Sequence, residues 1–222
     1  MRKLIHFALS AESRMARLAL REKGIAFDLV AEPYWERREA FLALNPASEV
    51  PVLIEGDGQA VAGAYAILEY VDEIAPLPDL IGQHPAERAE SRRLVAWFAH
   101  KFGDEVTRNV LGEKVMRRYN GTGEPSSEAI RAGLANLRVH LDYIGWLTER
   151  RAWLAGHAFG LADIAAAAQL SVIDYLGDVP WARHEPARDW YARVKSRPSF
   201  RAILEDRVAG LAPAGHYADL DF

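Results

Sequence analysis

The sequence predicts an α+β protein of two domains, a mixed domain over residues 1–75 and an all-helical domain over residues 86–210. Short apolar runs of strand length occur only in the first part of the chain, and long helical patterns follow. The prolines of Ala75–Pro78 and His84-Pro85 mark the connection between the two parts. The last segment, residues 211–222, lacks helical periodicity, and we interpret it as a C-terminal tail.

The N-terminal domain begins with a predicted strand, helix and second strand. Lys3–Ala8 forms the first strand, and either Ser10 or Ser13 can cap the helix that follows. Gly24 is expected to end this helix, because glycine adopts the left-handed conformation that closes many helices. Ala26–Val30 is the second predicted strand.

The segment Asn45–Leu53 organises the second half of this domain. Asn45-Pro46 ends a helix, since proline disfavours helical geometry in the residue before it. Pro51 precedes a short buried strand, Val52–Ile54, and at the head of a strand its missing N–H costs little. The other predicted elements are a helix around Tyr34 and Phe41, a hairpin turn at Glu55–Gly58, a strand at Ala60-Val61 and a helix at Ala64–Glu73.

The C-terminal domain is predicted to be helical throughout. Apolar side chains recur there at helical spacing, and loops rich in glycine or proline separate the patterns. The predicted helices are Glu87–Arg118, Ser126–Arg151, Leu161–Tyr175, Pro186–Lys195 and Pro198–Arg207.

Composition excludes several classes of function. The net charge of −4 argues against general nucleic-acid binding. The absence of cysteine removes disulfides, thiolate zinc sites and a cysteine nucleophile. The seven histidines lack metal-ligand spacing, so we predict no metal site. Without a targeting segment or an apolar run of about 18 residues, the protein is expected to be cytoplasmic and not inserted in a membrane.

The predicted order β-α-β-α-β-β-α, followed by helices, resembles the glutathione S-transferase (GST) family, whose N-terminal domain is thioredoxin-like. The resemblance rests on Val50-Pro51, Leu18–Gly24, Ala66-Ile67 with Tyr70, and Leu161-Ala162-Asp163. It implies a cis peptide bond before Pro51 and a backbone contact from Val50 to the cysteinyl part of glutathione. It also implies that Asp163 ties its helix to the preceding loop.

The glutathione site that this resemblance implies departs from the family pattern. By position, Ser10 matches the hydroxyl that stabilises the glutathione thiolate in serine-type enzymes, although a serine there is also an ordinary helix cap. Glu12 holds the position of the cysteine in cysteine-type enzymes, and a carboxylate raises the pKa of a nearby thiol. Gly63-Ala64 replaces the Glu/Gln-Ser pair that holds the γ-glutamyl group, at a cost on the order of 3 kcal/mol in binding.

We therefore interpret the pocket as vestigial, with no catalytic residue and no cofactor. The residues of this vestigial site are Ser10, Val50, Pro51, Gly63 and Ala64. The alternative is a working glutathione transferase that binds glutathione and uses Ser10 to stabilise its thiolate.

Other stretches are similar to one branch of the family, GST-like bacterial cell-division proteins that bind the tubulin-like polymer FtsZ. These stretches are Trp97-Phe98, Lys101-Phe102, Glu105–Arg108, Glu113–Arg118 and the aromatic and acidic C-terminus. The similarity implies a homodimer that is recruited to the division site, binds FtsZ filaments, affects their curvature and constriction, and performs no glutathione chemistry. A scaffold for a different partner remains a third hypothesis.

Two segments are candidates for contact with FtsZ. Trp35 precedes the charged run Glu36–Glu39, which predicts a substantially exposed indole, unless the ring packs on its own sheet. In the tail, Asp219 and Asp221 are expected to pair with basic groups, and Phe222 to fill a small pocket of the partner. The alternative is a tail that packs along its own helical domain.

Dimer contacts are expected from two helices by resemblance. They are the helix Ala64–Glu73 and the long helix that contains Arg92, Arg93 and Trp97. Arg14 and Arg21 lie seven residues apart on one helical face, and we interpret that face as solvated or facing another subunit.

Overall fold

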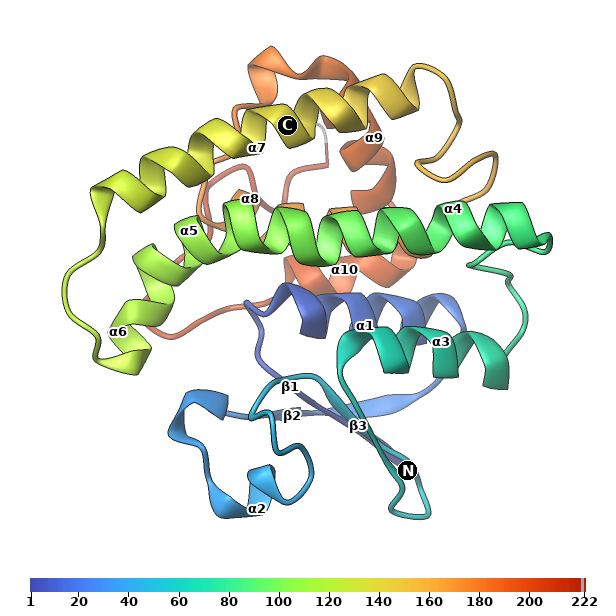
Figure 1. Ribbon diagram of the computed structural model, residues 1–222, viewed down its shortest axis with the longest axis vertical. Coiled ribbons are helices and arrows are strands. Elements are labelled where there is room, and N and C mark those ends of the chain that lie inside the picture. Colours follow the sequence, from blue (N-terminus) through green and yellow to red (C-terminus); the bar gives the residue numbers. More distant parts are fainter. Residues whose placement is uncertain (221) are drawn as a thin grey trace. The chain divides into compact units, whose positions relative to one another are not determined.

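The computed structural model describes residues 1–220 and 222. The chain forms two compact units, Met1–Leu80 and Ile81–Phe222. The first unit holds a four-stranded sheet with helices, and the second is helical (Figure 1). The α+β class and the division into a mixed and a helical part, both predicted from the sequence, are confirmed.

The sheet of the first unit has the strand order β2-β1-β3-β4. The strands are β1 (Arg2–His6), β2 (Phe27–Ala31), β3 (Val52–Ile54) and β4 (Ala60–Ala62). β1 and β2 are parallel and the other pairs are antiparallel, so β1 and β2 need a crossover, which α1 (Ala11–Glu22) supplies. Within this unit α1 and α3 (Ala64–Ile74) lie on one side of the sheet, and α2 (Glu39–Leu42) lies on the other (Figure 1).

The alternation of side chains along β1 builds a core on each face of the sheet. Leu4 is fully buried, and its neighbour Ile5 points to the opposite face. There Ile5 packs in a cluster with Phe41, Val50 and Val52. Val50, the residue that precedes Pro51, is thus part of the hydrophobic core. The peptide bond Val50-Pro51 is cis, as the resemblance to the GST family implies, and the bond Leu77-Pro78 is cis as well.

Helix α1 begins and ends where the sequence predicts. The Ser10 side chain caps it by accepting a hydrogen bond from the Ser13 N–H, and Gly24, with a φ of +66°, follows its end. The interpretation of Arg14 as a surface residue is wrong: this face of α1 is turned inward. Arg14 is fully buried and donates from Nε to the Ala8 carbonyl at 2.8 Å, whereas Arg21 is exposed.

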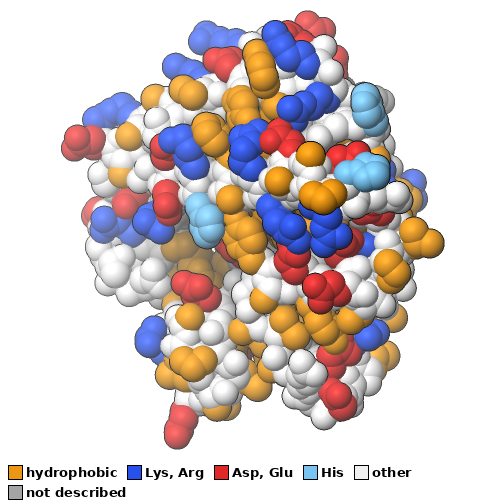
Figure 2. All heavy atoms as spheres, turned by 45° about the vertical axis from the view of Figure 1, so that its right-hand side comes forward, with side chains coloured by type: hydrophobic (Ala, Val, Ile, Leu, Met, Phe, Trp, Pro, Cys, Tyr) orange, Lys and Arg blue, Asp and Glu red, His pale blue; other side chains and the backbone are white. Residues whose placement is uncertain are grey.

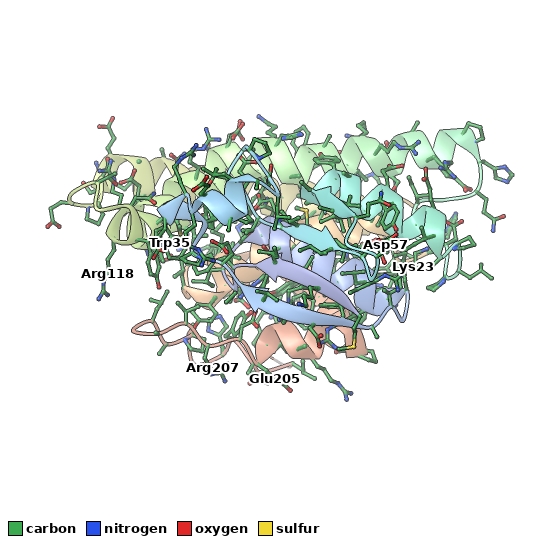
Figure 3. All side chains as sticks on the ribbon, turned by 90° about the horizontal axis from the view of Figure 1, so that it is seen from below. Lys23, Trp35, Asp57, Arg118, Glu205 and Arg207 are labelled. Atoms are coloured by element: carbon green, nitrogen blue, oxygen red, sulfur yellow. The ribbon has the colours of Figure 1, made fainter. Side chains whose placement is uncertain are left out.

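A buried lysine connects three segments of the first unit. The Lys23 ammonium lies 2.6 Å from the Asp72 carboxylate on α3 and donates to the Pro78 carbonyl at 2.5 Å (Figure 3 labels Lys23). This contact fixes the end of α1 against α3 and against the segment that ends the unit.

The second unit begins with one continuous helix over residues 85–120, slightly longer than the predicted Glu87–Arg118. Its hydrogen bonding changes along its length, from α4 (Pro85–Ala96) to a π-helical segment (Trp97–Thr107), α5 (Arg108–Leu111), a second π-helical segment (Gly112–Met116) and α6 (Arg117–Asn120). The remaining helices are α7 (Ser127–Thr148), α8 (Leu161–Tyr175), α9 (Glu185–Lys195) and α10 (Pro198–Leu204).

Helix α8 is the centre of the second unit, since every one of its residues is buried. The Asp163 carboxylate holds its start: one oxygen accepts from the Leu154 N–H (3.0 Å) and the Trp190 indole (2.8 Å), and the other from the Gly160 N–H (3.1 Å). Burial raises the pKa of Asp163 to about 6, although these donors favour the carboxylate. The predicted tie between Asp163 and the preceding loop is confirmed.

This arrangement predicts that Asp163→Asn is strongly destabilising. Asparagine keeps the size of the side chain but replaces one acceptor oxygen with an NH₂ group, which leaves a buried N–H without an acceptor. The free energy of unfolding, measured by urea denaturation, should fall by about 3 kcal/mol. The matched control Asp189→Asn, at an exposed position on α9, should change it by less than about 0.5 kcal/mol. Equal effects of the two variants would contradict this role.

Candidate functional site

The hydroxyl of Ser10 donates one hydrogen bond and accepts another inside the first unit. It accepts from the Ser13 N–H at 3.0 Å and donates to the Glu12 carboxylate at 3.1 Å. The Ser13 hydroxyl in turn accepts from the Phe7 N–H at 3.3 Å. Ser10 is thus a helix cap whose proton is directed to an acid.

The segment around the cis proline is joined directly to the start of α3. Val50 is buried, and the Pro51 carbonyl accepts from the Gly63 N–H at 3.0 Å. Gly63, with a φ of +89°, is the N-cap residue of α3 and supplies no side-chain cap. Gly63 and Ala64 thus leave this helix start without a polar side chain, as the sequence indicates. Of the predicted site residues, Pro51 and Gly63 are therefore in direct contact.

Trp35 lies on a 3₁₀ turn, Tyr34–Glu36, that follows β2 (Figure 3). Its indole packs edge-on against Phe7, with ring centroids 5.3 Å apart, and against the Tyr34 ring at 5.4 Å. Trp35 is half-buried rather than substantially exposed, because Phe7 at the end of β1 provides an aromatic support. The expected degree of exposure is therefore wrong, and part of the indole remains accessible.

The backbone that carries Trp35 is held in place. The Ser48 hydroxyl donates to the Tyr34 carbonyl at 2.9 Å, and the Arg37 N–H donates to the same carbonyl at 3.2 Å. Arg37 adopts a left-handed conformation with a φ of +49°, and Arg38 pairs with Glu32. Non-glycine residues in this conformation persist only where neighbouring contacts fix them. The turn therefore presents the indole in one orientation.

The tail is docked on its own unit. Asp219 is exposed, and Asp221 lies outside the described residues. Phe222 is half-buried against Trp181 and Tyr191, with ring centroids 5.1 and 5.9 Å away. The expectation that Phe222 fills a pocket of the partner does not agree with this position. Its pocket is formed by its own chain, as in the alternative that the sequence left open.

Two side chains expected at a dimer interface cross-link helices within the second unit. Arg93 on α4 lies 2.7 Å from Glu90 and donates to the Tyr143 hydroxyl on α7 at 3.0 Å. The Arg93 guanidinium is the main cause of the pKa of Glu90 falling to about 2. The Trp97 indole donates to Nδ1 of His140 at 3.1 Å. Both residues therefore have structural roles within the chain.

The part of the chain that the structure describes contains neither a metal site nor a membrane-spanning helix. Within residues 1–220 and 222, no group of three or more His, Asp or Glu side chains could hold a metal ion. No helix among the described residues is long and apolar enough to cross a membrane. On the face drawn in Figure 2, basic, acidic and hydrophobic side chains are interspersed.

Comparison with known proteins gives the family. Residues 4–79 match the family described as "Glutathione S-transferase, N-terminal domain". The whole chain is 50% identical to FtsZ-localized protein A of Caulobacter vibrioides, over 98% of that protein. The chain belongs to the GST superfamily.

Two solved structures of GST-superfamily proteins extend this similarity to three dimensions. "FzlA from C. crescentus" is 50% identical and has a TM-score of 0.97, covering 100% of this chain and 99% of the other. A protein from Rhodospirillum rubrum F11, described as a glutathione S-transferase, is 52% identical with a TM-score of 0.96, and each chain is covered completely. The thioredoxin-like N-terminal unit and the helical C-terminal unit are thus those of the GST fold.

The residues at the implied glutathione site do not fit glutathione well. Gly63 and Ala64 offer no side-chain partner to its γ-glutamyl group. The Ser10 proton is already donated to Glu12, and that carboxylate disfavours a neighbouring thiolate. The sequence revealed each of these residues, but the bond between Ser10 and Glu12 depends on the geometry of the first turn of α1.

This geometry predicts that Ser10→Ala affects stability and not glutathione chemistry. Loss of the cap should lower the free energy of unfolding by about 1 kcal/mol. Ser126→Ala is the matched control, because Ser126 caps α7 in the same way and should cost a similar amount. Calorimetric titration of the parent protein with glutathione should give no saturable heat at micromolar concentrations. Micromolar binding with transferase turnover that Ser10→Ala abolishes would contradict this prediction.

Proposed function

We propose that this protein is a non-catalytic cell-division regulator of the GST superfamily. It binds FtsZ filaments in the cytoplasm, is recruited to the division site, and affects filament curvature and constriction. The observation that carries the proposal is the 50% identity to FtsZ-localized protein A along the entire chain. Half of the aligned residues of the two proteins are identical, and the alignment spans both units of this chain, so the similarity extends well beyond the shared fold.

The geometry of the first unit supports the non-catalytic part of this proposal. A thiolate-stabilising serine must aim its proton at the sulfur, whereas Ser10 donates to Glu12 and caps α1. Gly63 and Ala64 remove two side-chain contacts to the γ-glutamyl group, which lowers affinity by roughly a hundredfold.

The second candidate function is a glutathione transferase that uses Ser10. It is favoured by the similar Rhodospirillum rubrum protein, which is described as a glutathione S-transferase. For this activity the Ser10 hydroxyl would have to turn away from Glu12. Because the bond to Glu12 would be lost, we place this function second.

We assign FtsZ contacts to each unit separately, to Trp35 in the first and to the acids of the tail, Asp219 and Asp221, in the second; these residues are called the FtsZ-binding surface below. A tryptophan on an ordered turn is an effective anchor, because little conformational entropy is lost when the partner covers the ring. The acids act mainly on the rate of association, since charges at the rim of an interface steer encounter more than they hold the complex.

We further propose that the protein is a homodimer whose interface includes α3 and the α4 face that bears Arg92. A dimer carries two copies of the FtsZ-binding surface. A filament repeats its own subunits, so both copies can bind one filament, and the second contact forms at a high effective concentration.

The first prediction from this proposal concerns Trp35. Trp35→Ala should weaken co-sedimentation with FtsZ polymer by roughly 30-fold, since loss of an interface anchor costs about 2 kcal/mol. Circular dichroism should be unchanged. The matched control is Trp146→Ala, which removes a tryptophan that is 49% exposed on α7 and outside the proposed surface. If both tryptophan variants bind like the parent protein, Trp35 is not an anchor.

The second prediction concerns the oligomeric state. Light scattering at tens of micromolar should give a mass twice that of one chain, because the proposed interface joins two identical copies. Charge reversal at an exposed position of that interface, Arg92→Glu, should shift the population towards monomer. A monomeric mass for the unaltered protein at this concentration would contradict the dimer.

A further inference from the structure

The second unit contains a buried ammonium that contacts the tail. Lys195, the last residue of α9, is 0% exposed. Its Nζ donates to the backbone carbonyl of Asp219 and lies 3.9 Å from the centre of the Phe222 ring. Burial of a charged group is costly unless other groups compensate the charge, and burial lowers the pKa of Lys195. The partners of this ammonium therefore matter for the structure around it.

The tail supplies two of those partners. The Asp219 carbonyl is a hydrogen-bond acceptor, and the face of the Phe222 ring attracts a cation. The buried Asp174 carboxylate is a third group that compensates the charge of Lys195. Burial lowers the pKa of Lys195, and the negative charge of Asp174 partly opposes this shift. If the tail left its position, the ammonium would lose the carbonyl and the ring together.

The Phe222 ring lies in an aromatic pocket of its own unit. Trp181 and Tyr191 stack on each other with centroids 4.9 Å apart, and Phe222 meets both of them close to edge-on. The imidazole of His216 lies nearly parallel to the Phe222 ring at 6.0 Å and bonds to Asp174 at 2.9 Å. The pocket therefore combines apolar contact with the cation of Lys195.

More of the tail is fixed before Asp219. Tyr217 is fully buried, packs against Tyr175 at 5.1 Å, and donates its hydroxyl proton to the Ile203 carbonyl at 3.2 Å. The Asp219 N–H donates to the His216 carbonyl at 3.0 Å. Asp219 itself is exposed, so its side chain reaches the surface from a backbone that is held on both sides.

We propose that Lys195 and Phe222 are positioning residues that hold the acidic tail in the conformation that binds FtsZ. We call this contact the tail latch: Lys195 with the Asp219 carbonyl and the Phe222 ring. The proposal rests on the proposed FtsZ binding and gives Phe222 a different role, as an intramolecular anchor. A tail ordered in advance loses less conformational entropy on binding.

The test uses Lys195→Met, which removes the charge and keeps the length of the side chain. Because Lys195 is fully buried in the unbound protein, its side chain offers no surface to FtsZ, and the exchange measurement shows whether an effect on binding acts through the tail. Phe222→Leu is a second variant, at a half-buried position, that keeps apolar volume but loses the aromatic face. The conservative variant Phe222→Tyr keeps that face. Leu220→Ala, at an exposed position of the same tail, is the matched control.

Two quantities are measured for each variant. Hydrogen exchange of the Tyr217 and Asp219 amides, without FtsZ, reports how often the tail opens. Co-sedimentation with FtsZ polymer reports binding. In Lys195→Met and Phe222→Leu we expect exchange to be faster by about tenfold or more and binding to weaken by a similar factor. In Phe222→Tyr and Leu220→Ala both quantities should stay close to those of the parent.

Three results would overturn the latch. One is faster hydrogen exchange of the tail amides with unchanged binding to FtsZ polymer, which means that the order of the tail does not affect FtsZ binding. Another is weaker binding with unchanged exchange, which makes Phe222 a direct contact. The third is no change in either quantity for Lys195→Met and Phe222→Leu. If the parent protein does not co-sediment with FtsZ, the proposed function fails, and the exchange rates alone decide whether Lys195 holds the tail.

Discussion

A buried polar group must find its hydrogen-bond partners inside the protein, and this constraint governs both units of the chain. Asp163 accepts from three donors and so fixes the start of the central helix. Ser10, which by resemblance matches the serine of serine-type enzymes, caps α1 and donates its proton to Glu12. We propose that this use of the hydroxyl within the fold disfavours glutathione chemistry.

The segments proposed to bind a partner are ordered by the same means. The turn that carries Trp35 is held by Ser48, and the tail backbone at Asp219 is held by the buried Lys195. Each segment presents a side chain at the surface from a backbone that is already fixed. Binding to a repeating polymer by a dimer would then use two small, preorganised contacts on each copy rather than a large apolar interface.

Local sequence patterns predicted the order of the elements, because strand and helix signals depend on residues close together in the chain. The cis bond at Pro51 and the role of Asp163 were implied by the resemblance to the GST family, and both are present in the structure. The errors came from contacts between distant residues. Trp35 is supported by Phe7, which directly follows β1, and Phe222 by Trp181, which lies on the 3₁₀ turn Trp181–Arg183. The burial of Arg14 likewise depends on which face of α1 turns inward, and helical spacing alone does not decide this.

We propose that the chain keeps the GST fold and binds a cell-division polymer without glutathione. The most direct measurement is co-sedimentation of the unaltered protein with FtsZ polymer, with and without millimolar glutathione. We expect saturable binding to the polymer and the same affinity in both conditions, because the proposed surface does not include the implied glutathione site. Absence of binding to the polymer, or its loss on addition of glutathione, would contradict the proposed function.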